Sequence, residues 1–337
     1  MFDQAAMPPG HYLVLGSTGL VGSHSLLRLS EREGIQVRAV YHKRKPHIFA
    51  NNIEYVNADL TERGDCDAVM TDIDYMLLFA GIILSAPVTA NDPVGPVMTN
   101  LLLTSQSLKA AYHAGIKKVV WLSSTTGYPP LEGRIKEDEM FQGDPPDVNY
   151  PIGWMTRYVE TLCNMYTTKL PRNMTVIVLR PTMIYGEYDE FRFDRAHFLP
   201  AFIRRVVERE NPIEVWGTGE QTRDVIHAAD VVEASLLALQ YVDEFETFNI
   251  AHGRSHTIND ILHSILAIDN YSDAQISHLK STLVTVSNRS FDNGKAKRIL
   301  RFEPQITMET GIKRTIEWYR REHEFLSIQS YADDQNN

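Results

Sequence analysis

Three glycines near the start of the chain have the spacing of a turn that binds an anion through its backbone. Gly16, Gly19 and Gly22 follow a short apolar run and precede a segment with helical spacing. The first glycine permits a tight bend, the second lets the backbone approach a pyrophosphate, and the third lets the helix pack closely on the sheet. Free amides at the helix N-terminus then face the anion. The turn predicted to bind a dinucleotide comprises Gly16, Ser17, Thr18, Gly19, Leu20, Val21 and Gly22.

Basic residues follow the second predicted strand. Lys43, Arg44 and Lys45 follow residues 36–41 after one intervening residue, His42, at the place where an acidic residue would bind the ribose hydroxyls of NAD. Lys43 and Arg44 can pair instead with a 2′-phosphate, so the sequence favours NADP as the cofactor and leaves NAD open. The alternative interpretation is a solvated basic loop.

Asp59 follows the third predicted strand. Its carboxylate can accept a hydrogen bond from the adenine amino group. The alternative is an aspartate that only stabilises a turn, which is a common role for this residue type.

The elements that must position these residues alternate along the chain. Apolar segments typical of buried strands occur at residues 11–16, 36–41, 53–56, 75–79, 118–122 and 175–179. Helical spacing occurs at residues 20–32, 97–114 and 158–166. Uniformly apolar strands that alternate with helices indicate a parallel sheet with both faces covered. The predicted fold class is therefore α/β, with a Rossmann-type doubly wound parallel sheet.

The pattern changes after Pro181, where loop-like segments separate helices predicted at 198–208 and 230–240 from strands at 212–216 and 247–251. We expect a dinucleotide-binding domain from residues 8–185 and roughly 224–251. A smaller, mainly C-terminal substrate lobe is expected from residues 186–223 and 252–325. Residues 327–337 are polar and acidic, and are expected to form a disordered tail.

Composition excludes several classes of function. The 337 residues carry a formal net charge of −10, which argues against a nucleic-acid partner because phosphate binding needs a basic surface. Cys66 and Cys163 offer neither a disulfide framework nor metal-ligand spacing, so no metal site is expected. No apolar stretch approaches the roughly 20 residues that span a bilayer, and residues 1–10 lack the pattern of a signal peptide. We expect a cytoplasmic protein without a membrane partner.

Several of these motifs together resemble the extended short-chain dehydrogenase/reductase family of nucleotide-sugar epimerases, dehydratases and reductases. The glycine turn, Asp59-Leu60, residues 79–81, residues 122–129 and residues 179–186 carry the resemblance, which extends from about residue 11 to 321. The resemblance implies that Leu60, Ala80 and Gly81 contact adenine and ribose. It also implies that Pro181 and Met183 lie on the strand that supports the nicotinamide.

The strongest match to this family is residues 215–224, followed by His227 and Asp230. In the family this segment closes over the sugar nucleotide, which implies substrate contacts for Trp216 and Arg223. An arginine suits that role because its planar fork meets two phosphate oxygens at once. The alternative for Arg223 is an ion pair with Asp224 or Asp230. Residues 196–205, which include His197 as a substrate-binding candidate, resemble a helix of GDP-fucose synthases.

The sequence departs from the family at its Tyr-x-x-x-Lys pair, in which the lysine lowers the tyrosine pKa. Aligning Tyr150 with the catalytic tyrosine puts Trp154 at the lysine position. Aligning on residues 162–166 instead puts Ile152 and Thr156 at the two positions, and we prefer this register because it needs no gap. Neither register gives an intact pair. Tyr150 remains a candidate catalytic residue that would enter the cleft from the N-terminal side of the helix.

Ser124 occupies the hydroxyl position of the family and is the other candidate catalytic residue. The alternative is a serine that bonds the backbone at the end of a strand. Thr125 and Thr126 are expected near the substrate, but they replace the Asp-Glu of dehydratases and so argue against 4,6-dehydration. Thr126 and Tyr188 also stand where GDP-fucose synthases have a cysteine and a histidine, which argues against their epimerisation chemistry.

These observations predict a nucleotide-sugar-modifying enzyme of the epimerase/reductase type, with bound NAD(P) and an altered acid–base set. Two alternatives stay open: a redox-inactive dinucleotide-binding sensor or partner protein, and a non-redox isomerase or lyase. The expected partners are a nucleotide-diphosphate sugar and a second copy of the chain. The homodimer would pair helices at 97–114 and 154–168, unless their apolar residues face their own sheet. The candidate contacts are Met98, Leu101, Leu102, Leu108 and Tyr112.

Overall fold

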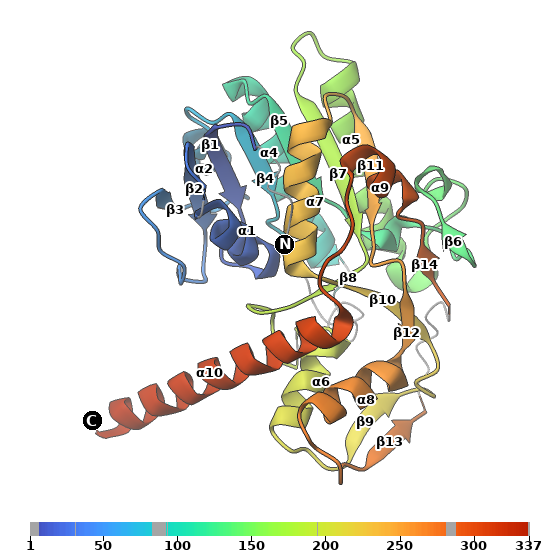
Figure 1. The fold of residues 1–337 in the computed structure, drawn as a ribbon. Helices are drawn as coiled ribbons and strands as arrows, with labels where there is room; N and C mark the ends of the chain where they lie inside the picture. Colours follow the sequence, from blue (N-terminus) through green and yellow to red (C-terminus); the bar gives the residue numbers. More distant parts are fainter. Residues whose placement is uncertain are drawn as a thin grey trace.

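A seven-stranded parallel sheet forms the centre of the molecule (Figure 1). The structure is a computed structural model that describes residues 7–30, 32–82, 92, 94–193, 195–280 and 288–335, with side chains described as far as residue 322. The strand order is β11-β7-β5-β4-β1-β2-β3, and every neighbouring pair is parallel. The strands are β1 (Gly10–Leu15), β2 (Ile35–Tyr41), β3 (Ile53–Asn57), β4 (Tyr75–Leu78), β5 (Lys118–Leu122), β7 (Thr175–Pro181) and β11 (Glu246–Ile250).

Helices cover both faces of this sheet. α1 (Leu20–Ser30), α7 (Ala228–Tyr241) and α9 (Gly294–Leu300) contribute to one hydrophobic cluster. α2 (Arg63–Val69), α4 (Val94–Ala114) and α5 (Tyr150–Thr168) contribute to the cluster on the opposite face. The doubly wound α/β fold predicted from the sequence is confirmed.

The strands show why their sequences are uniformly apolar. Side chains alternate between the two faces of a strand. Tyr12 and Val14 of β1 belong to one cluster, and Leu13 and Leu15 belong to the other. All four side chains are fully buried, so neither face of β1 meets solvent.

A second group of elements packs around a third hydrophobic cluster below the sheet in Figure 1. It contains a three-stranded sheet of β8 (Met183–Tyr185), β10 (Thr222–His227) and β12 (Ser255–Thr257), and a pair of β9 (Ile213–Trp216) with β13 (Ile276–Leu279). α6 (Phe198–Val207), α8 (Ile258–Ile268) and α10 (Met308–Gln335) pack against these strands. β6 (Arg134–Ile135) pairs with β14 (Ser290–Phe291) beside the main sheet.

Two segments differ from the expected organisation. Residues 252–325 were all expected in the smaller lobe, but Ala296, Leu300 and Phe302 belong to the cluster of α1 and α7. The short helix α9 returns the chain to the large sheet because its apolar residues pack on α7 and β11. A disordered tail was expected at 327–337, whereas α10 continues through Gln335 and projects from the body in Figure 1; residues 336–337 lie outside the described chain.

α10 begins in very close contact with β8 and the end of β10. A Cβ atom added at Gly311 would lie 2.2 Å from the Tyr185 hydroxyl oxygen and 2.9 Å from Cδ2 of His227. Only a residue without a side chain fits this crossing. Among the described helices, none is both long and apolar enough to cross a membrane.

Candidate functional site

The three glycines of the predicted dinucleotide turn have separate steric roles. Gly16 adopts a φ of +81°, and a Cβ there would lie 2.7 Å from Cα of Ala80 at the end of β4. A Cβ at Gly22 would lie 2.1 Å from the carbonyl oxygen of Gly16. A Cβ at Gly19 would meet nothing closer than that oxygen, at 3.4 Å. Gly16 and Gly22 are therefore required by packing, while the surface over Gly19 is open enough for a ligand to approach.

The side chains of the turn anchor it to the protein. Ser17 donates to the carbonyl oxygen of Val40 through both its amide (3.0 Å) and its hydroxyl (2.8 Å). Val21 is buried in the core and Leu20 packs against it. The groups left to meet a phosphate are therefore backbone amides at the start of α1, and their contact with a phosphate stays a prediction.

Ala80 and Gly81 continue from β4 at the carboxyl edge of the sheet. Ala80 borders Gly16, and Gly81 is exposed. The next residue, Ile82, is held by Asn100 of α4, whose side chain accepts from its amide (2.7 Å) and donates to its carbonyl (2.9 Å). This places Gly81 on a fixed loop beside the glycine turn, consistent with its predicted cofactor contact.

Asp59 makes the contacts of a turn residue. Its Oδ1 accepts from the amide (2.9 Å) and the hydroxyl (2.7 Å) of Thr61, and these bonds hold the pKa of Asp59 below its usual value. Oδ2 lies 3.6 Å from Nε2 of His42. Leu60 is buried in the core on the α2 side. The structure thus shows the structural role of Asp59, and its adenine contact stays a prediction.

Of the basic residues after β2, Arg44 is the one that reaches the glycine turn. Its Nη1 donates to the carbonyl oxygen of Thr18 (3.3 Å), and its Nη2 lies 3.2 Å from a carboxylate oxygen of Glu190. Lys43 is exposed to solvent. Arg44 therefore stands at the place where a 2′-phosphate was predicted to bind.

Ser124 lies just after β5, at the carboxyl edge of the sheet. Its Oγ accepts from the amide (3.1 Å) and the hydroxyl (3.0 Å) of Thr126 within the turn Thr125–Gly127. Because the oxygen is the acceptor in both bonds, the hydroxyl proton can still be donated to a substrate oxygen. Ser124, Thr125 and Thr126 are all half-buried.

α5 shows how the missing Tyr/Lys pair is replaced. Thr156 is only 2% exposed, and its hydroxyl donates to the carbonyl of Ile152 (2.8 Å), one helical turn earlier. Arg157 does not reach back to this place: its Nε donates to Gly127 O (2.8 Å) and its Nη2 to Gly143 O (2.5 Å). The positive charge of Arg157 is therefore committed to the loop that follows Ser124.

Tyr150 lies on a different side of α5 from Thr156. Six positions correspond to about 120° of net rotation around a helix. The Tyr150 side chain is 47% exposed, and its ring centroid lies 6.3 Å from that of Trp154 in an edge-to-face arrangement. Its catalytic role stays a prediction, and the contacts of the described chain give it no path to Ser124.

A buried polar network ties β5, α5 and β7 together beneath Ser124. Glu160 Oε1 accepts from Ser123 Oγ (2.8 Å) and from Nε of Arg180 (2.9 Å), and Oε2 accepts from Nη2 of Arg180 (2.5 Å). Arg180 also donates to the hydroxyl of Tyr128 (2.8 Å). Burial opposes the charge of Arg180, but Glu160 outweighs it and raises the pKa of the guanidinium. Arg180 is thus neutralised in the core and does not replace the lysine.

The strand that was expected to support the nicotinamide is fixed by a carboxylate. Pro181 pairs with Ile250 of β11, and Met183 is half-buried. Asp224 accepts from the hydroxyl of Thr182 (3.0 Å) and from the amides of His252 (2.9 Å) and Gly253 (2.8 Å). The role of Asp224 is thus to join β10, β7 and the loop after β11.

A second arginine, which sequence reasoning missed, lies near Arg223. Arg289 donates from Nη2 to the carbonyls of Tyr128 and Pro129 (3.0 Å each), and its Nε is buried without a hydrogen-bond partner in the described chain. Burial, and then the positive charge of Arg223, lower the pKa of Arg289 to about 10. Burial also lowers the pKa of Arg223, which donates to Thr222 O (2.7 Å). No local motif marks Arg289, because the pairing of β14 with β6 brings it here.

The other two substrate candidates lie on the smaller group of elements. Trp216 ends β9 and is 49% exposed. His197 precedes α6 and is half-buried, and burial lowers its pKa. Their contact with a substrate stays a prediction.

His24, Glu187 and His227 form a buried cluster that the sequence did not predict. Nε2 of His227 lies 2.9 Å and Nε2 of His24 lies 3.6 Å from Oε2 of Glu187, while Arg314 donates to Oε1 (2.8 Å). The spacing would suit a metal ion. However, Nδ1 of His227 accepts from the amide of Ala229 (3.2 Å), so Nε2 carries the proton of the neutral ring and faces the carboxylate. The cluster is therefore better described as a buried charge centre in which Arg314 donates to the Glu187 carboxylate and the two histidines lie close to it.

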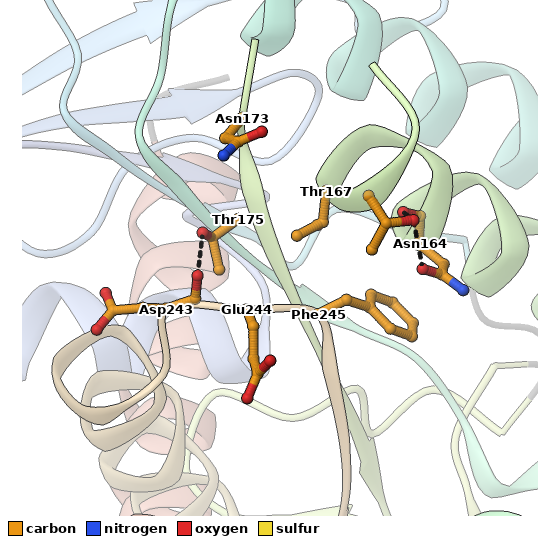
Figure 2. Close-up of a pocket in the computed structure, with 8 residues that line it drawn as sticks. Asn164, Thr167, Asn173, Thr175, Asp243, Glu244 and Phe245 are labelled. Atoms are coloured by element: carbon orange, nitrogen blue, oxygen red, sulfur yellow. Dashed lines mark hydrogen bonds between the residues drawn. The ribbon is translucent and has the colours of Figure 1, made fainter. Parts of the chain in front are cut away.

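A polar hollow lies far from all of these residues (Figure 2). Thr175, at the start of β7, donates to Asp243 O (3.1 Å) there. The start of β7 is at the opposite edge of the sheet from Pro181, where the strand ends. The hollow is thus separate from the predicted site. Its lining residues are Asn164, Thr167, Thr168, Asn173, Thr175, Asp243, Glu244 and Phe245.

Comparison with known proteins places this architecture in a family. Residues 12–251 match the model of the NAD dependent epimerase/dehydratase family, and the chain belongs to that family. The resemblance found in the sequence motifs is thereby confirmed. Among curated relatives, dTDP-4-dehydro-6-deoxy-D-allose reductase from Streptomyces sp is 27% identical over 91% of this chain and 95% of that protein.

Solved structures show the same fold at low sequence identity. UDP-glucose 4-epimerase from Thermotoga maritima, solved with UDP-glucose, has a TM-score of 0.83 and 24% identity over 93% of this chain and 99% of its own. UDP-glucuronic acid 4-epimerase from Bacillus cereus, solved with UDP-glucuronic acid and NAD, has a TM-score of 0.80 and 22% identity over 92% of this chain and 99% of its own.

Proposed function

We propose that this chain is a nucleotide-sugar-modifying enzyme of the epimerase/reductase type. The observation that carries the proposal is the pair Arg223 and Arg289. The positive charges of these two guanidinium groups repel each other, and the pKa values of both groups are lowered. A diphosphate bound at this pair would neutralise the two charges. The unpaired Nε of Arg289 supplies a donor for that anion. Relatives solved with UDP-sugars support the choice of ligand.

In this proposal the dinucleotide binds at the glycine turn, and the diphosphate of the sugar nucleotide binds at Arg223 and Arg289. The amides after Gly16 would hold the pyrophosphate of NAD(P), and the bound cofactor would supply or accept hydride at nicotinamide C4. Arg289 reaches the loop that follows Ser124 through its bonds to Tyr128 and Pro129. Ser124 would orient the reacting oxygen of the sugar by donating its hydroxyl proton. Tyr150, which is exposed at the start of α5, is the proposed candidate for proton transfer.

We propose NADP(H) as the preferred cofactor. This choice rests on Arg44, because its guanidinium donates to the carbonyl of Thr18 in the glycine turn. A 2′-phosphate at that place would form charge-assisted hydrogen bonds with Arg44, and Lys43 would add to the local positive potential. The measurement is a pair of dissociation constants, for NADPH and NADH, by titration calorimetry.

We propose that residues 186–223, together with the part of 252–325 that packs around the third cluster, bind the sugar nucleotide. We also propose a homodimer through α4 and α5. The expected contacts need revision, because Leu108 is fully buried and Leu101 and Tyr112 pack against their own core. The large apolar residues that these two helices expose are Val94, Met98, Leu102, Tyr150, Trp154 and Tyr158.

Calorimetric titration with UDP, GDP, dTDP and CDP tests the diphosphate site. At least one should bind, and Arg289→Gln should weaken it about 10- to 100-fold, because a hydrogen bond to a charged group contributes about 1.5–3 kcal/mol. Arg63→Gln, at a 72% exposed side chain of α2, is the control and should bind as the unmodified protein does. Failure of every nucleoside diphosphate to bind, or equal binding by Arg289→Gln, would refute the proposed site.

Turnover tests the activity itself. The protein is incubated with the corresponding nucleotide sugars and their 4-keto derivatives, together with NADPH or NAD. Product is followed by mass spectrometry and by cofactor absorbance. Binding of both ligands without hydride transfer to or from any of these sugars would contradict the enzymatic proposal.

A further inference from the structure

The guanidinium of Arg44 is shared between the dinucleotide turn and a carboxylate from a distant loop. Nη1 donates to Thr18 O (3.3 Å), while Nη2 lies 3.2 Å from Oε2 of Glu190. Glu190 follows β8 and reaches Arg44 from the side of the smaller group of elements. The cation at the proposed 2′-phosphate position is thus already paired with an anion of the protein.

Glu190 is held firmly in this position by its own loop. Oε1 accepts from the amide (3.1 Å) and Nε (3.0 Å) of Arg192, and Oε2 accepts from Nη2 of the same residue (2.8 Å). Burial opposes ionisation of Glu190, but Arg192 outweighs it and lowers the pKa of the carboxyl. Glu190 is therefore an ionised carboxylate at neutral pH, with a fixed orientation toward Arg44.

The loop itself is clamped at its start. Glu187 contacts His227 (2.9 Å) and Arg314 (2.8 Å), which belong to the end of β10 and to α10. The ring of Tyr188 stacks on His47, with centroids 4.9 Å apart, in the same segment that carries Arg44. Glu190 and Tyr188 thus make two contacts across the adenosine end of the proposed cofactor site, so the Arg44 pair is built into the fold.

A second carboxyl lies beside this pair. Asp189 accepts from the amide of Glu190 through Oδ1 (2.7 Å), and its Oδ2 is buried without a partner in the described chain. Any negative charge on Asp189 adds to that of Glu190. Burial raises the pKa of Asp189 to about 7, so Glu190 is the ionised carboxylate of this loop that faces Arg44.

We propose that Glu190 is a specificity-determining residue that weakens the binding of dinucleotides with a 2′-phosphate by competing for Arg44. The inference rests on the proposed cofactor site. NADP(H) must displace Glu190 from Arg44 before its 2′-phosphate can use both ends of the guanidinium. NAD(H) leaves the pair intact. Glu190 thus sets the ratio of the two affinities without contacting the part of the cofactor that the two share.

The test compares dissociation constants for NADPH and NADH in the unmodified protein, in Glu190→Gln and in Glu54→Gln. Glu54 is the matched control because it also pairs with an arginine, Arg38 (3.1 Å), but on the far edge of the sheet. Glu190→Gln should tighten NADPH binding about 10-fold or more, since charge pairs at a binding site couple by more than about 1.5 kcal/mol, and should change NADH binding less than about twofold. A ratio of affinities that stays within about twofold of the unmodified protein overturns the proposal.

A double-mutant cycle assigns the effect to Arg44. In an Arg44→Gln background, Glu190→Gln should no longer change the affinity ratio, because the contested cation is absent. An equal gain in both backgrounds overturns the role of Arg44. Binding of nucleoside diphosphates is measured in parallel. If the unmodified protein binds none of them, the proposed function is refuted. If it binds one and Glu190→Gln leaves the NADPH/NADH affinity ratio unchanged, only the role of Glu190 is refuted.

Discussion

At the scale of single residues, the most consequential feature is the absence of the tyrosine and the lysine that the family's Tyr-x-x-x-Lys pair would place on α5. Ile152 and Thr156 lie on one face of α5, and the Thr156 hydroxyl donates a hydrogen bond to the carbonyl of Ile152. The nearest cation on the helix, Arg157, is bound to the carbonyls of Gly127 and Gly143. Acid–base chemistry at this site therefore has to come from groups outside this pair, such as Ser124 or the proposed Tyr150.

Restoring the pair tests this interpretation. Ile152→Tyr combined with Thr156→Lys places a phenol and an ammonium group one helical turn apart, where the lysine can lower the tyrosine pKa. A positioned general acid–base group contributes about 10²- to 10⁴-fold, so single-turnover hydride transfer should rise by at least about tenfold. Ile152→Tyr alone is the control and should gain much less. Thermal unfolding confirms that both variants fold, and a folded double variant with no gain would contradict the interpretation that the missing pair limits proton transfer at this site.

His24 gives a prediction about acid stability. Burial, followed by the nearby His227, lowers the pKa of His24 from 6.5 to about 4. Between these values the unfolded chain binds a proton that the folded chain excludes. Stability from this group is complete above pH 6.5 and falls by about 3 kcal/mol as the pH drops to 4. Urea unfolding of His24→Gln should show a shallower loss over this range than His113→Gln, an exposed control; equal slopes would rule out His24 as the source.

Single residues were predicted from sequence where a motif fixed the backbone around them, as at Gly16 and Gly22. The outcome was different where partners come from elsewhere in the chain. Arg289 and Glu187 acquire their roles from strand pairings and helix crossings that a local pattern does not contain. The partners of Arg157, the carbonyls of Gly127 and Gly143, likewise come from a loop that the helical pattern does not describe.

At the scale of elements, the β1–α1 unit carries the dinucleotide site, and its glycines make a matched pair of tests. Gly22→Ala places a methyl group 2.1 Å from Gly16 O and should unfold or strongly destabilise the protein. Gly19→Ala meets that oxygen only at 3.4 Å, so stability should change by less than about 1 kcal/mol. Its methyl group would occupy the approach of a pyrophosphate, and NADPH affinity should fall by about tenfold or more. Unchanged affinity in folded Gly19→Ala would place the cofactor elsewhere.

The buried polar network beneath Ser124 leads to a prediction about protein stability. Glu160→Gln leaves the buried charge of Arg180 without its anion and should destabilise the protein by about 3–5 kcal/mol. Glu54→Gln breaks a surface ion pair and should change stability by less than about 1 kcal/mol. Both values come from urea unfolding. Similar small losses in the two variants would mean that the network does not hold β5, α5 and β7 together.

Long apolar segments were the elements that sequence periodicity located well. The strands predicted at 118–122 and 175–179 correspond to β5 and β7, and the helix predicted at 97–114 corresponds to α4. Short elements such as α2, β6 and β14 were not predicted, because two to seven residues hold too little periodicity to separate a helix or strand from a loop. α9 was predicted to belong to the smaller lobe, but it packs against α7 and the large sheet. This contact between distant segments leaves no signal in the local sequence.

At the scale of the whole molecule, exposed apolar residues of α4 and α5 predict self-association. Met98 is 56% exposed and Trp154 is 40% exposed. Met98→Glu should convert a dimer to a monomer, because a charge in an apolar interface lacks a partner. Light scattering after gel filtration measures the mass. Phe49→Glu, at a 77% exposed side chain after β2, is the control, and a monomeric unmodified protein would contradict the proposed dimer.

The crossing of α10 at Gly311 lies within the smaller group of elements and has a consequence for the loop that follows β8. At Gly311 the helix lies so close to β8 and the end of β10 that a methyl group does not fit between them. Three residues later, Arg314 contacts the carboxylate of Glu187. Adding a single carbon atom at Gly311 would push the helix outward and withdraw Arg314 from Glu187. One methyl group there would therefore loosen the loop that carries Glu187 and Glu190 without touching the glycine turn of β1 and α1.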